Sequence, residues 1–213
     1  MNRKINKIAV IGSGVMGSGI ACHFANIGIE VLLLDIAPNK LNDNENKLGL
    51  SLDDKKVKNR IVNEMFQRCI KSKPAPLYHK TFSKRVELGN LTDDLSKISD
   101  VDWIIEVVTE KLNIKQIVFD QIEKFRSPGT LVTSNTSGIP IKQMNEGRSE
   151  DFRKNFAVTH FFNPPRYLKL FEIIPGPDCD PKIIDFLNDF GERFLGKDFV
   201  LAKDTPGFIG NRI

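Results

Sequence analysis

KIAVIGSGVMGSGIACHFANIG, residues 7–28, is the part of this 213-residue chain that says most about its architecture. It begins as a short apolar run, which is typical of a buried strand, and continues with the composition of a helix that ends at Gly28. Where the strand passes into the helix, Gly12, Gly14 and Gly17 have the spacing G-x-G-x-x-G. A strand, a glycine turn and a helix in this order predict a unit that binds a dinucleotide.

Each glycine of this turn has its own expected task. Gly12 permits the tight turn, Gly14 lets a pyrophosphate approach the backbone, and Gly17 lets the helix pack closely. The next apolar run ends in Asp35, eighteen residues after Gly17. A carboxylate there can accept hydrogen bonds from the adenosine ribose and would repel a 2′-phosphate, so the sequence predicts NAD rather than NADP. An ordinary strand–helix–strand unit with incidental glycines is the alternative.

Apolar runs and amphipathic segments alternate through the rest of the chain. Further strands are expected at residues 29–35, 86–91, 102–108, 129–137, 156–162, 168–176 and 198–204. Helices are expected at 110–125 and at 180–196, the latter with one apolar face made of Ile183, Ile184, Leu187, Phe190 and Phe194. This alternation predicts an α/β fold of the Rossmann type, with a doubly wound, mostly parallel sheet covered by helices on both faces.

The domain organisation follows from this pattern. Residues 1–204 are expected to form an NAD-binding Rossmann domain, with a helical insertion at about residues 38–85 that is interpreted as a helical hairpin. Residues 205–213 are expected to begin a linker helix, with Thr205 as its N-cap and Pro206 in its first turn. Because a natural domain rarely ends one turn into a helix, we expect a fragment whose next domain is absent.

Charge is concentrated in the insertion. Residues 38–85 hold twelve Lys or Arg against five Asp or Glu, a balance of +7 in a chain whose net charge is +4. One interpretation is a solvated helical face, and the other is a surface that meets an anionic ligand. The insertion has few aromatic residues on which bases could stack, so nucleic acid is not an expected partner.

Composition excludes several other classes. The apolar runs are too short and too interrupted for a membrane helix, and the basic start of the chain passes into the glycine turn rather than into a signal peptide. Cys22, Cys69 and Cys179 form neither a disulfide framework nor a metal-binding pattern. A reducing compartment, the cytoplasm, is therefore the expected location, and no metal is expected.

Polar residues follow three of the apolar segments, in SNTSG (134–138), HFFNPP (160–165) and GFIGNR (207–212). Strand ends of a doubly wound sheet are where ligands bind. Each feature also has a structural interpretation, because Ser and Asn commonly make turns and a histidine in a strand is commonly part of the core. Glu172, twelve residues after His160, could be an edge residue that faces water.

Taken together, GSGVMGSGIA, SNTSG, HFFNPPRYLKLFEII and KDTPGFIGNR resemble the NAD-binding domain of the 3-hydroxyacyl-CoA dehydrogenases, in order and over essentially all of the chain. The segment NPPRYLKLFEIIPG is similar to the corresponding sequence in the bacterial long-chain branch of the family. In that branch further domains follow, including one like enoyl-CoA hydratase. The family carries a helical C-terminal domain that forms the dimer and closes the acyl site. Nothing in this sequence corresponds to it.

The resemblance implies the NAD-dependent oxidation of (S)-3-hydroxyacyl-CoA to 3-oxoacyl-CoA in fatty-acid β-oxidation. His160 matches the catalytic histidine, which would take the proton of the 3-hydroxyl while hydride leaves C3 for NAD. Glu172 matches its carboxylate partner, which would fix the tautomer and stabilise the imidazolium. Ser137, Asn163 and Asn211 match the polar residues around the substrate oxygen and the catalytic pair.

The resemblance also implies binding residues. Glu110 and Lys115 match positions near the ribose and nicotinamide, while Val15, Met16 and Asn135 are counted as cofactor-binding residues with the glycines and Asp35. The insertion would contribute to the coenzyme A site, with Lys55, Lys58 and Arg60 as candidate contacts. The chain alone is expected to have low activity, because desolvation and substrate positioning need the absent domain.

Two alternatives stay open at this point. A dehydrogenase of a free hydroxy acid would not need the basic insertion, because such a substrate has no CoA phosphates. A non-catalytic NAD-binding protein would not need the pair formed by His160 and Glu172.

Overall fold

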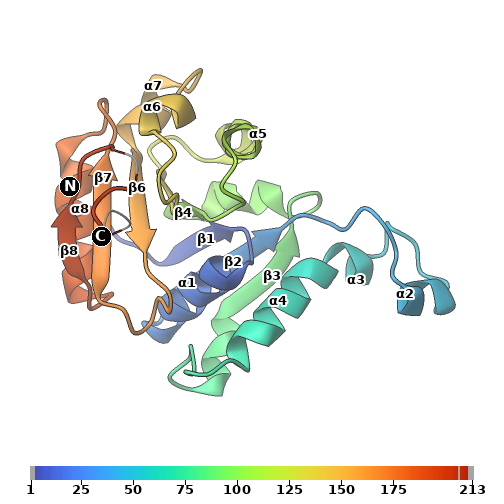
Figure 1. Cartoon of the computed structure of the whole chain (residues 1–213). Coiled ribbons are helices and arrows are strands. Elements are labelled where there is room, and N and C mark those ends of the chain that lie inside the picture. Colours follow the sequence, from blue (N-terminus) through green and yellow to red (C-terminus); the bar gives the residue numbers. More distant parts are fainter. Residues whose placement is uncertain (1–2, 206, 211–213) are drawn as a thin grey trace.

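Eight strands form a single sheet in the order β3-β2-β1-β4-β5-β6-β7-β8 in the computed structural model, which describes residues 3–205 and 207–210. The strands are β1 (Lys7–Ile11), β2 (Glu30–Asp35), β3 (Val86–Asn90), β4 (Trp103–Glu106), β5 (Leu131–Ser134), β6 (Phe156–Phe161), β7 (Leu170–Pro175) and β8 (Asp198–Leu201). All neighbours run parallel except β6 and β7, which are antiparallel. The predicted doubly wound, mostly parallel sheet is confirmed, and each expected strand is present (Figure 1).

Helices cover both faces of this sheet. They are α1 (Val15–Asn26), α2 (Asp43–Lys47), α3 (Lys55–Lys58), α4 (Arg60–Ile70), α5 (Leu112–Phe125), α6 (Ile141–Met144), α7 (Glu150–Lys154) and α8 (Pro181–Arg193), with the 3₁₀ helices η1 (Lys80–Arg85) and η2 (Leu95–Asp100). The short helices α6, α7 and η2 were not predicted, because four to six residues are too few to show a helical period. None of the described helices is both long enough and apolar enough to cross a membrane.

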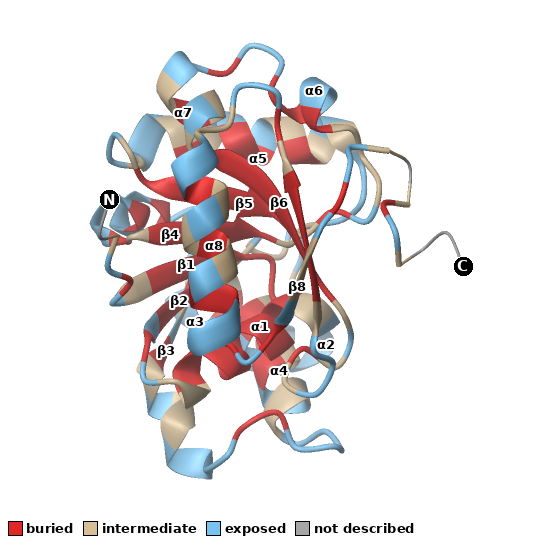
Figure 2. Cartoon of the chain, turned by 90° about the vertical axis from the view of Figure 1, so that its left-hand side faces the viewer, coloured by how far each residue is buried: buried red, intermediate tan, exposed pale blue. Residues whose placement is uncertain are grey.

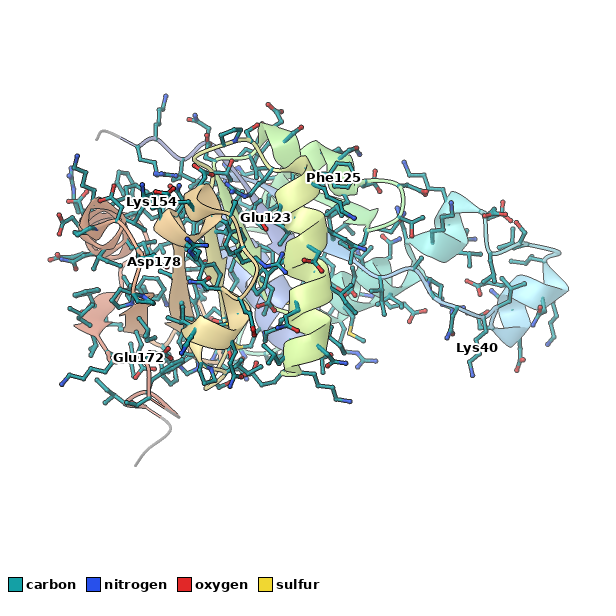
Figure 3. The ribbon with its side chains drawn as sticks, turned by 90° about the horizontal axis from the view of Figure 1, so that it is seen from above. Lys40, Glu123, Phe125, Lys154, Glu172 and Asp178 are labelled. Carbon is teal, nitrogen blue, oxygen red and sulfur yellow. The ribbon has the colours of Figure 1, made fainter. Side chains whose placement is uncertain are left out.

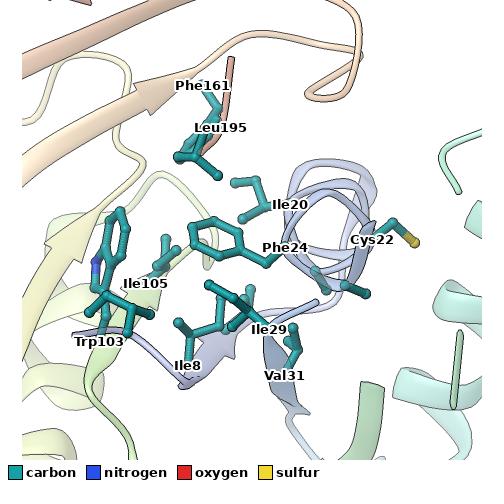
Figure 4. Packing of buried hydrophobic residues seen from close by; sticks show 14 of the residues in the cluster. Ile8, Ile20, Cys22, Phe24, Ile29, Val31, Trp103, Ile105, Phe161 and Leu195 are labelled. Atoms are coloured by element: carbon teal, nitrogen blue, oxygen red, sulfur yellow. The ribbon is translucent and has the colours of Figure 1, made fainter. Parts of the chain in front are cut away.

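The sheet separates two apolar cores. Along β1, Ile8 and Val10 point into the core that contains α1, α4 and α8, and Ala9 and Ile11 point into the core that contains α5, α6 and α7. This alternation follows from the two-residue period of a strand. Phe24 of α1 lies in the first core with its ring 5.3 Å from that of Trp103 (Figure 4). Burial on both faces explains why the central strands are mostly apolar (Figure 2).

The insertion is helical but is not the expected hairpin of two comparable helices. Only α4 is long, and its Val62 and Phe66 are buried against the core that contains α1. The helices α2 and α3 have five and four residues, and with Lys40 they stand away from the body of the molecule (Figure 3). The segment between them contains Gly49, with φ +65°, and turn-forming polar residues that favour turns over a continuous helix.

Two expectations about the C-terminal part need revision. The helix α8 buries Ile183, Leu187 and Phe190 as predicted, but Phe194 follows the end of the helix and is 54% exposed. The helix expected to begin at Thr205 is not seen in the described part, where residues 207–210 form a turn. Pro206 and residues 211–213 lie outside the described residues.

Candidate active site

The glycine turn lies where β1, β2, β4, β5 and β6 all end, at one edge of the sheet. The strand order reverses between β1 and β4, and this is the point at which doubly wound sheets bind ligands. Gly12 has φ +104°, and a Cβ atom there would lie 2.6 Å from the Val107 carbonyl oxygen. A Cβ on Gly17 would lie 1.8 Å from the carbonyl oxygen of Gly12. Both positions therefore require glycine, as the sequence predicts.

Gly14 differs, because a Cβ built there would meet no atom within 4 Å. The turn is thus open toward the N-terminus of α1, where no side chain caps the helix. Unpaired amides at a helix start favour an anion. Val15, which is 69% exposed, and the half-buried Met16 form this helix start. The arrangement fits the pyrophosphate of a dinucleotide.

A pair of alanine substitutions separates the packing role from the binding role. Gly17→Ala is expected to lower the free energy of unfolding by at least about 3 kcal/mol, because backbone rather than a side chain must move. Gly14→Ala is expected to change it by less than about 1 kcal/mol, since φ is −55° and the space is open. Urea unfolding measures the free energy of unfolding of both variants. NADH titration measures cofactor binding, which Gly14→Ala is expected to weaken. Gly14→Ala with unweakened NADH binding would contradict the assignment of the open space to the cofactor.

Asp35 ends β2 directly beside the glycine turn. Its Oδ2 accepts a hydrogen bond from the Ser13 amide at 2.6 Å and another from the Ser13 hydroxyl, while its Oδ1 accepts from the Ile36 amide at 2.7 Å. The structure therefore brings the predicted acid and the predicted turn together. Ser13 was not predicted as a site residue, although it lies between the first two glycines.

His160 and Glu172 face each other across β6 and β7. They are directly opposite in the antiparallel register, and Nδ1 of His160 lies 2.7 Å from Oε2 of Glu172. His160 is 6% exposed and Glu172 is fully buried (Figure 3 labels Glu172). A carboxylate can only accept, so Nδ1 donates in this bond, and in the neutral imidazole Nε2 then carries the lone pair.

The turn at residues 207–210 closes over this pair. The other oxygen of Glu172, Oε1, accepts hydrogen bonds from the amides of Ile209 at 3.0 Å and Gly210 at 2.8 Å. The imidazole of His160 lies 4.4 Å from the ring of Phe162 and 5.8 Å from that of Phe208. Glu172 thus has both oxygens bonded, and aromatic rings surround the histidine.

A network of buried polar groups lies at the ends of β4 and β5, and β5 is the neighbour of β6, which carries His160. Lys115, which is 1% exposed, places its ammonium 2.7 Å from Oε1 of the fully buried Glu106 and 3.4 Å from Oε2 of Glu110. Glu106 also accepts from the Val108 amide at 2.7 Å and from the Ser134 hydroxyl. Glu106 was not predicted, although an acid inside the apolar run WIIEVV is a signal for a buried partner.

Glu110 connects this network to the segment after β5. Its Oε1 accepts from the Thr136 hydroxyl and from the Ser137 amide at 2.9 Å. Burial raises the pKa of the Glu110 carboxyl, but the Thr136 hydrogen bond and the charge of Lys115 outweigh it, so the net pKa is lowered. Glu110 therefore stays ionised. Asn135 accepts from the Phe161 amide at 2.8 Å and joins the ends of β5 and β6.

The structure brings the remaining predicted residues into no comparable network of hydrogen bonds around His160, as far as the described residues show. Ser137 and Asn163 are exposed, and Asn163 lines a cavity of about 210 Å³ between the glycine turn and α4, together with Gly14, Val15, Gly19, Met65, Arg68, Cys69, Ser72, Pro74, Pro76, Pro164, Pro165 and Arg166. Asn211 lies outside the described residues. Of the three candidate CoA contacts, Lys58 pairs with Asp93 at 3.0 Å and Arg60 pairs with Glu45, so both cations are already engaged within the chain.

Comparisons with known proteins show the family of this chain. A family model described as "3-hydroxyacyl-CoA dehydrogenase, NAD binding domain" matches residues 7–205. A Bacillus subtilis protein named "Probable 3-hydroxyacyl-CoA dehydrogenase" is 53% identical over 213 residues, which is 100% of this chain and 27% of that protein. The human mitochondrial hydroxyacyl-coenzyme A dehydrogenase is 33% identical over 209 residues, which is 98% of this chain and 62% of that protein. The chain thus spans less than two thirds of the length of these relatives.

Solved structures give the same result. The (S)-3-hydroxybutyryl-CoA dehydrogenase of Ralstonia eutropha matches with a TM-score of 0.73 at 26% identity, over 99% of this chain and 68% of that one. The 3-hydroxybutyryl-CoA dehydrogenase of Escherichia coli matches with a TM-score of 0.71 at 30% identity, over 98% of this chain and 40% of that one.

Proposed function

Because this chain belongs to the family of 3-hydroxyacyl-CoA dehydrogenase NAD-binding domains, we propose that it oxidises (S)-3-hydroxyacyl-CoA to 3-oxoacyl-CoA with NAD, within fatty-acid β-oxidation. The observation that carries the proposal is the bond between His160 and Glu172 at the same sheet edge as the open glycine turn. A proton acceptor and a dinucleotide site side by side are what an alcohol dehydrogenation requires.

His160 acts as the general base. Its Nε2 takes the proton of the substrate 3-hydroxyl, and Nδ1 keeps its own proton in the bond to Glu172. The imidazolium that forms is stabilised by the buried carboxylate, which the amides of Ile209 and Gly210 hold in place. NAD, when bound, supplies the acceptor for the hydride that leaves C3.

The other groups bind and orient. The amides at the start of α1 hold the pyrophosphate, and Asp35 accepts hydrogen bonds from the ribose hydroxyls. Glu110 and Lys115, which pair at 3.4 Å, would lie near the ribose and nicotinamide, as the resemblance implies, and Asn135 joins the ends of β5 and β6. We assign Ser137, Asn163 and Asn211 to the polar residues around the substrate oxygen and the catalytic pair, as the resemblance implies, and the positive insertion to the phosphates of CoA.

The test of this function is acetoacetyl-CoA-dependent oxidation of NADH by the complete polypeptide that contains these residues. Free acetoacetate at the same concentration serves as the control substrate. We expect turnover with the thioester and a rate lower by at least about 100-fold with the free acid, since two missing CoA contacts account for such a difference. Equal rates with both would instead support the alternative of a free hydroxy acid substrate. No oxidation of either, with NADH bound, would support the non-catalytic alternative.

Asp35→Asn tests the choice of cofactor. The wild type is expected to bind NADH more tightly than NADPH, because the Asp35 carboxylate repels a 2′-phosphate. The amide keeps an oxygen for Ser13 and removes the charge, so the preference should fall by at least about tenfold, or 1.4 kcal/mol. Titrations of both nucleotides measure the ratio. Asp100→Asn, which changes an exposed carboxylate, is the matched control, and an unchanged ratio in Asp35→Asn would refute the assigned role.

Three further predictions are part of the proposal. Cysteine usage supports a cytoplasmic location, and the family resemblance supports dimerisation through a C-terminal helical domain. The boundary between the NAD-binding domain and the linker is placed at residue 204.

A further inference from the structure

The ammonium group of Lys197 is buried against residues 163–169, the segment that follows β6, which is the strand that carries His160. Lys197 lies just before β8 and is 3% exposed. Its Nζ donates to the carbonyl oxygen of Leu168 at 2.6 Å and to that of Pro165. Among the residues that the structure describes, no carboxylate lies within 4.0 Å of this ammonium. A buried charge is costly without polar partners, so the two carbonyls are its compensation.

The groups around Lys197 do not neutralise it. His23 of α1 bonds the Leu195 carbonyl oxygen at 3.1 Å, and burial and then the charge of Lys197 lower its pKa to about 4. Arg166 is the other charged group that acts on His23. Burial lowers the pKa of Lys197 itself to about 8. At neutral pH these groups are therefore two cations, Lys197 and Arg166, and the neutral imidazole of His23. Two cations without a carboxylate partner among the described residues do not favour the stability of the fold.

Residues 163–169, here named the bridge loop, connect three parts of the molecule. Pro165 packs on Gly19 of α1, where an added Cβ would lie 3.0 Å from its ring. Arg166 donates to the carbonyl oxygens of Ala75 at 2.6 Å and Leu77 at 3.2 Å, and its guanidinium lies 4.1 Å from the centre of the Tyr78 ring. The Tyr167 hydroxyl also donates to the Ala75 carbonyl oxygen, at 2.9 Å. The bridge loop thus joins the end of β6 to the end of the insertion.

We propose that Lys197 is a positioning residue, whose ammonium fixes the bridge loop and, through Arg166, holds residues 75–78 of the insertion against the catalytic strand. The bridge loop and the insertion together line the cavity of about 210 Å³ beside Gly14. In this proposal Lys197 contacts none of the reacting atoms. It fixes the positions of Asn163 and Arg166, which line that cavity. The effect of Lys197 on the kinetics of the reaction rests on the proposed function, whereas its effect on the order of the bridge loop does not.

Amide hydrogen exchange tests the structural consequence on the chain as it is. Lys197→Met keeps the apolar length and removes the donors, and Lys203→Met makes the same change at an exposed lysine nearby. We expect exchange in the bridge loop and in residues 75–78 to rise at least about tenfold in Lys197→Met, with β1 and β4 unchanged and Lys203→Met like the wild type. Arg166→Met should raise exchange at residues 75–78 only. Unchanged exchange in Lys197→Met, or an equal rise in every strand, would overturn the proposal.

The pH dependence separates the charge of Lys197 from its size. Above pH 8 the ammonium loses its proton, so protection of the bridge loop should fall, after correction for the intrinsic exchange rate. Lys197→Arg should keep that protection, because arginine stays charged. His23 is neutral and Arg166 charged throughout this range. Since the folded pKa lies below the unfolded one, the contribution of Lys197 to global stability rises between pH 8 and 10.5. Loop protection that does not change through pH 8 would contradict the proposal.

Kinetics then connect the loop to the reaction. In the complete polypeptide, Lys197→Met is expected to raise KM for acetoacetyl-CoA at least about tenfold and to change kcat by less than about threefold. A fall in kcat with unchanged KM would overturn the positioning role. If the wild type does not oxidise NADH, the proposed function fails while the exchange result still decides the role of Lys197.

Discussion

Replacing His160 with glutamine is expected to lower kcat/KM for the 3-hydroxyacyl-CoA reaction by about 10²–10⁴-fold, which is about 2.7–5.5 kcal/mol of transition-state stabilisation. The side-chain amide of glutamine cannot take a proton from an alcohol, so the proton acceptor that Nε2 provides is lost. Glutamine is close in size, and the rings of Phe162 and Phe208 still enclose the position. The measurement is acetoacetyl-CoA-dependent oxidation of NADH in the complete polypeptide.

The control for this experiment is His79→Gln, the same substitution at an exposed histidine of the insertion. It should leave the rate unchanged. NADH binding should be equal in both variants and in the wild type, because neither substitution changes the glycine turn or Asp35, the groups assigned to the pyrophosphate and the ribose. Equal rates for His160→Gln and the wild type would refute the mechanism and leave the NAD-binding assignment intact.

Glu106→Ala should cause a large loss of stability. Among the described residues, it leaves the buried ammonium of Lys115 only two partners, Glu110 at 3.4 Å and the Val108 carbonyl oxygen at 3.5 Å. Removing one partner of a buried ion pair costs about 3–5 kcal/mol, because the other charge stays uncompensated. Urea unfolding should show a lower midpoint with an unchanged slope.

A double-mutant cycle isolates the ion pair from the loss of packing. Glu106→Ala combined with Lys115→Met should be more stable than Glu106→Ala alone, since no unpaired charge then remains. Glu110→Ala, at a side chain that is 43% exposed, should cost much less. If the two single effects add to the effect of the double variant, Glu106 and Lys115 are not coupled and the network described here is wrong.

The two buried charges, Glu106 and Lys197, show why part of the site was missed. Glu106 lies inside an apolar strand, and its partner Lys115 comes from the following helix, nine residues later. Lys197, after a glycine, has the sequence context of a surface lysine, and its partners Pro165 and Leu168 are 32 and 29 residues away. A lysine looks the same in sequence whether water or two carbonyl groups surround it, so its burial depends on contacts that no local pattern contains.

Local patterns were sufficient for the succession of strands and main helices along the chain, for the glycine turn and for the position of Asp35 beside that turn. The reason is that strand and helix periods, and the close backbone contacts that require glycine at positions 12 and 17, act between residues near in sequence. Tertiary packing decided which segments meet. It placed Glu172 opposite His160 through the antiparallel register, brought residues 209–210 onto the same carboxylate, and divided the insertion into one docked helix and two short ones. Those outcomes depend on which surfaces bury each other, and that is a property of the whole folded chain.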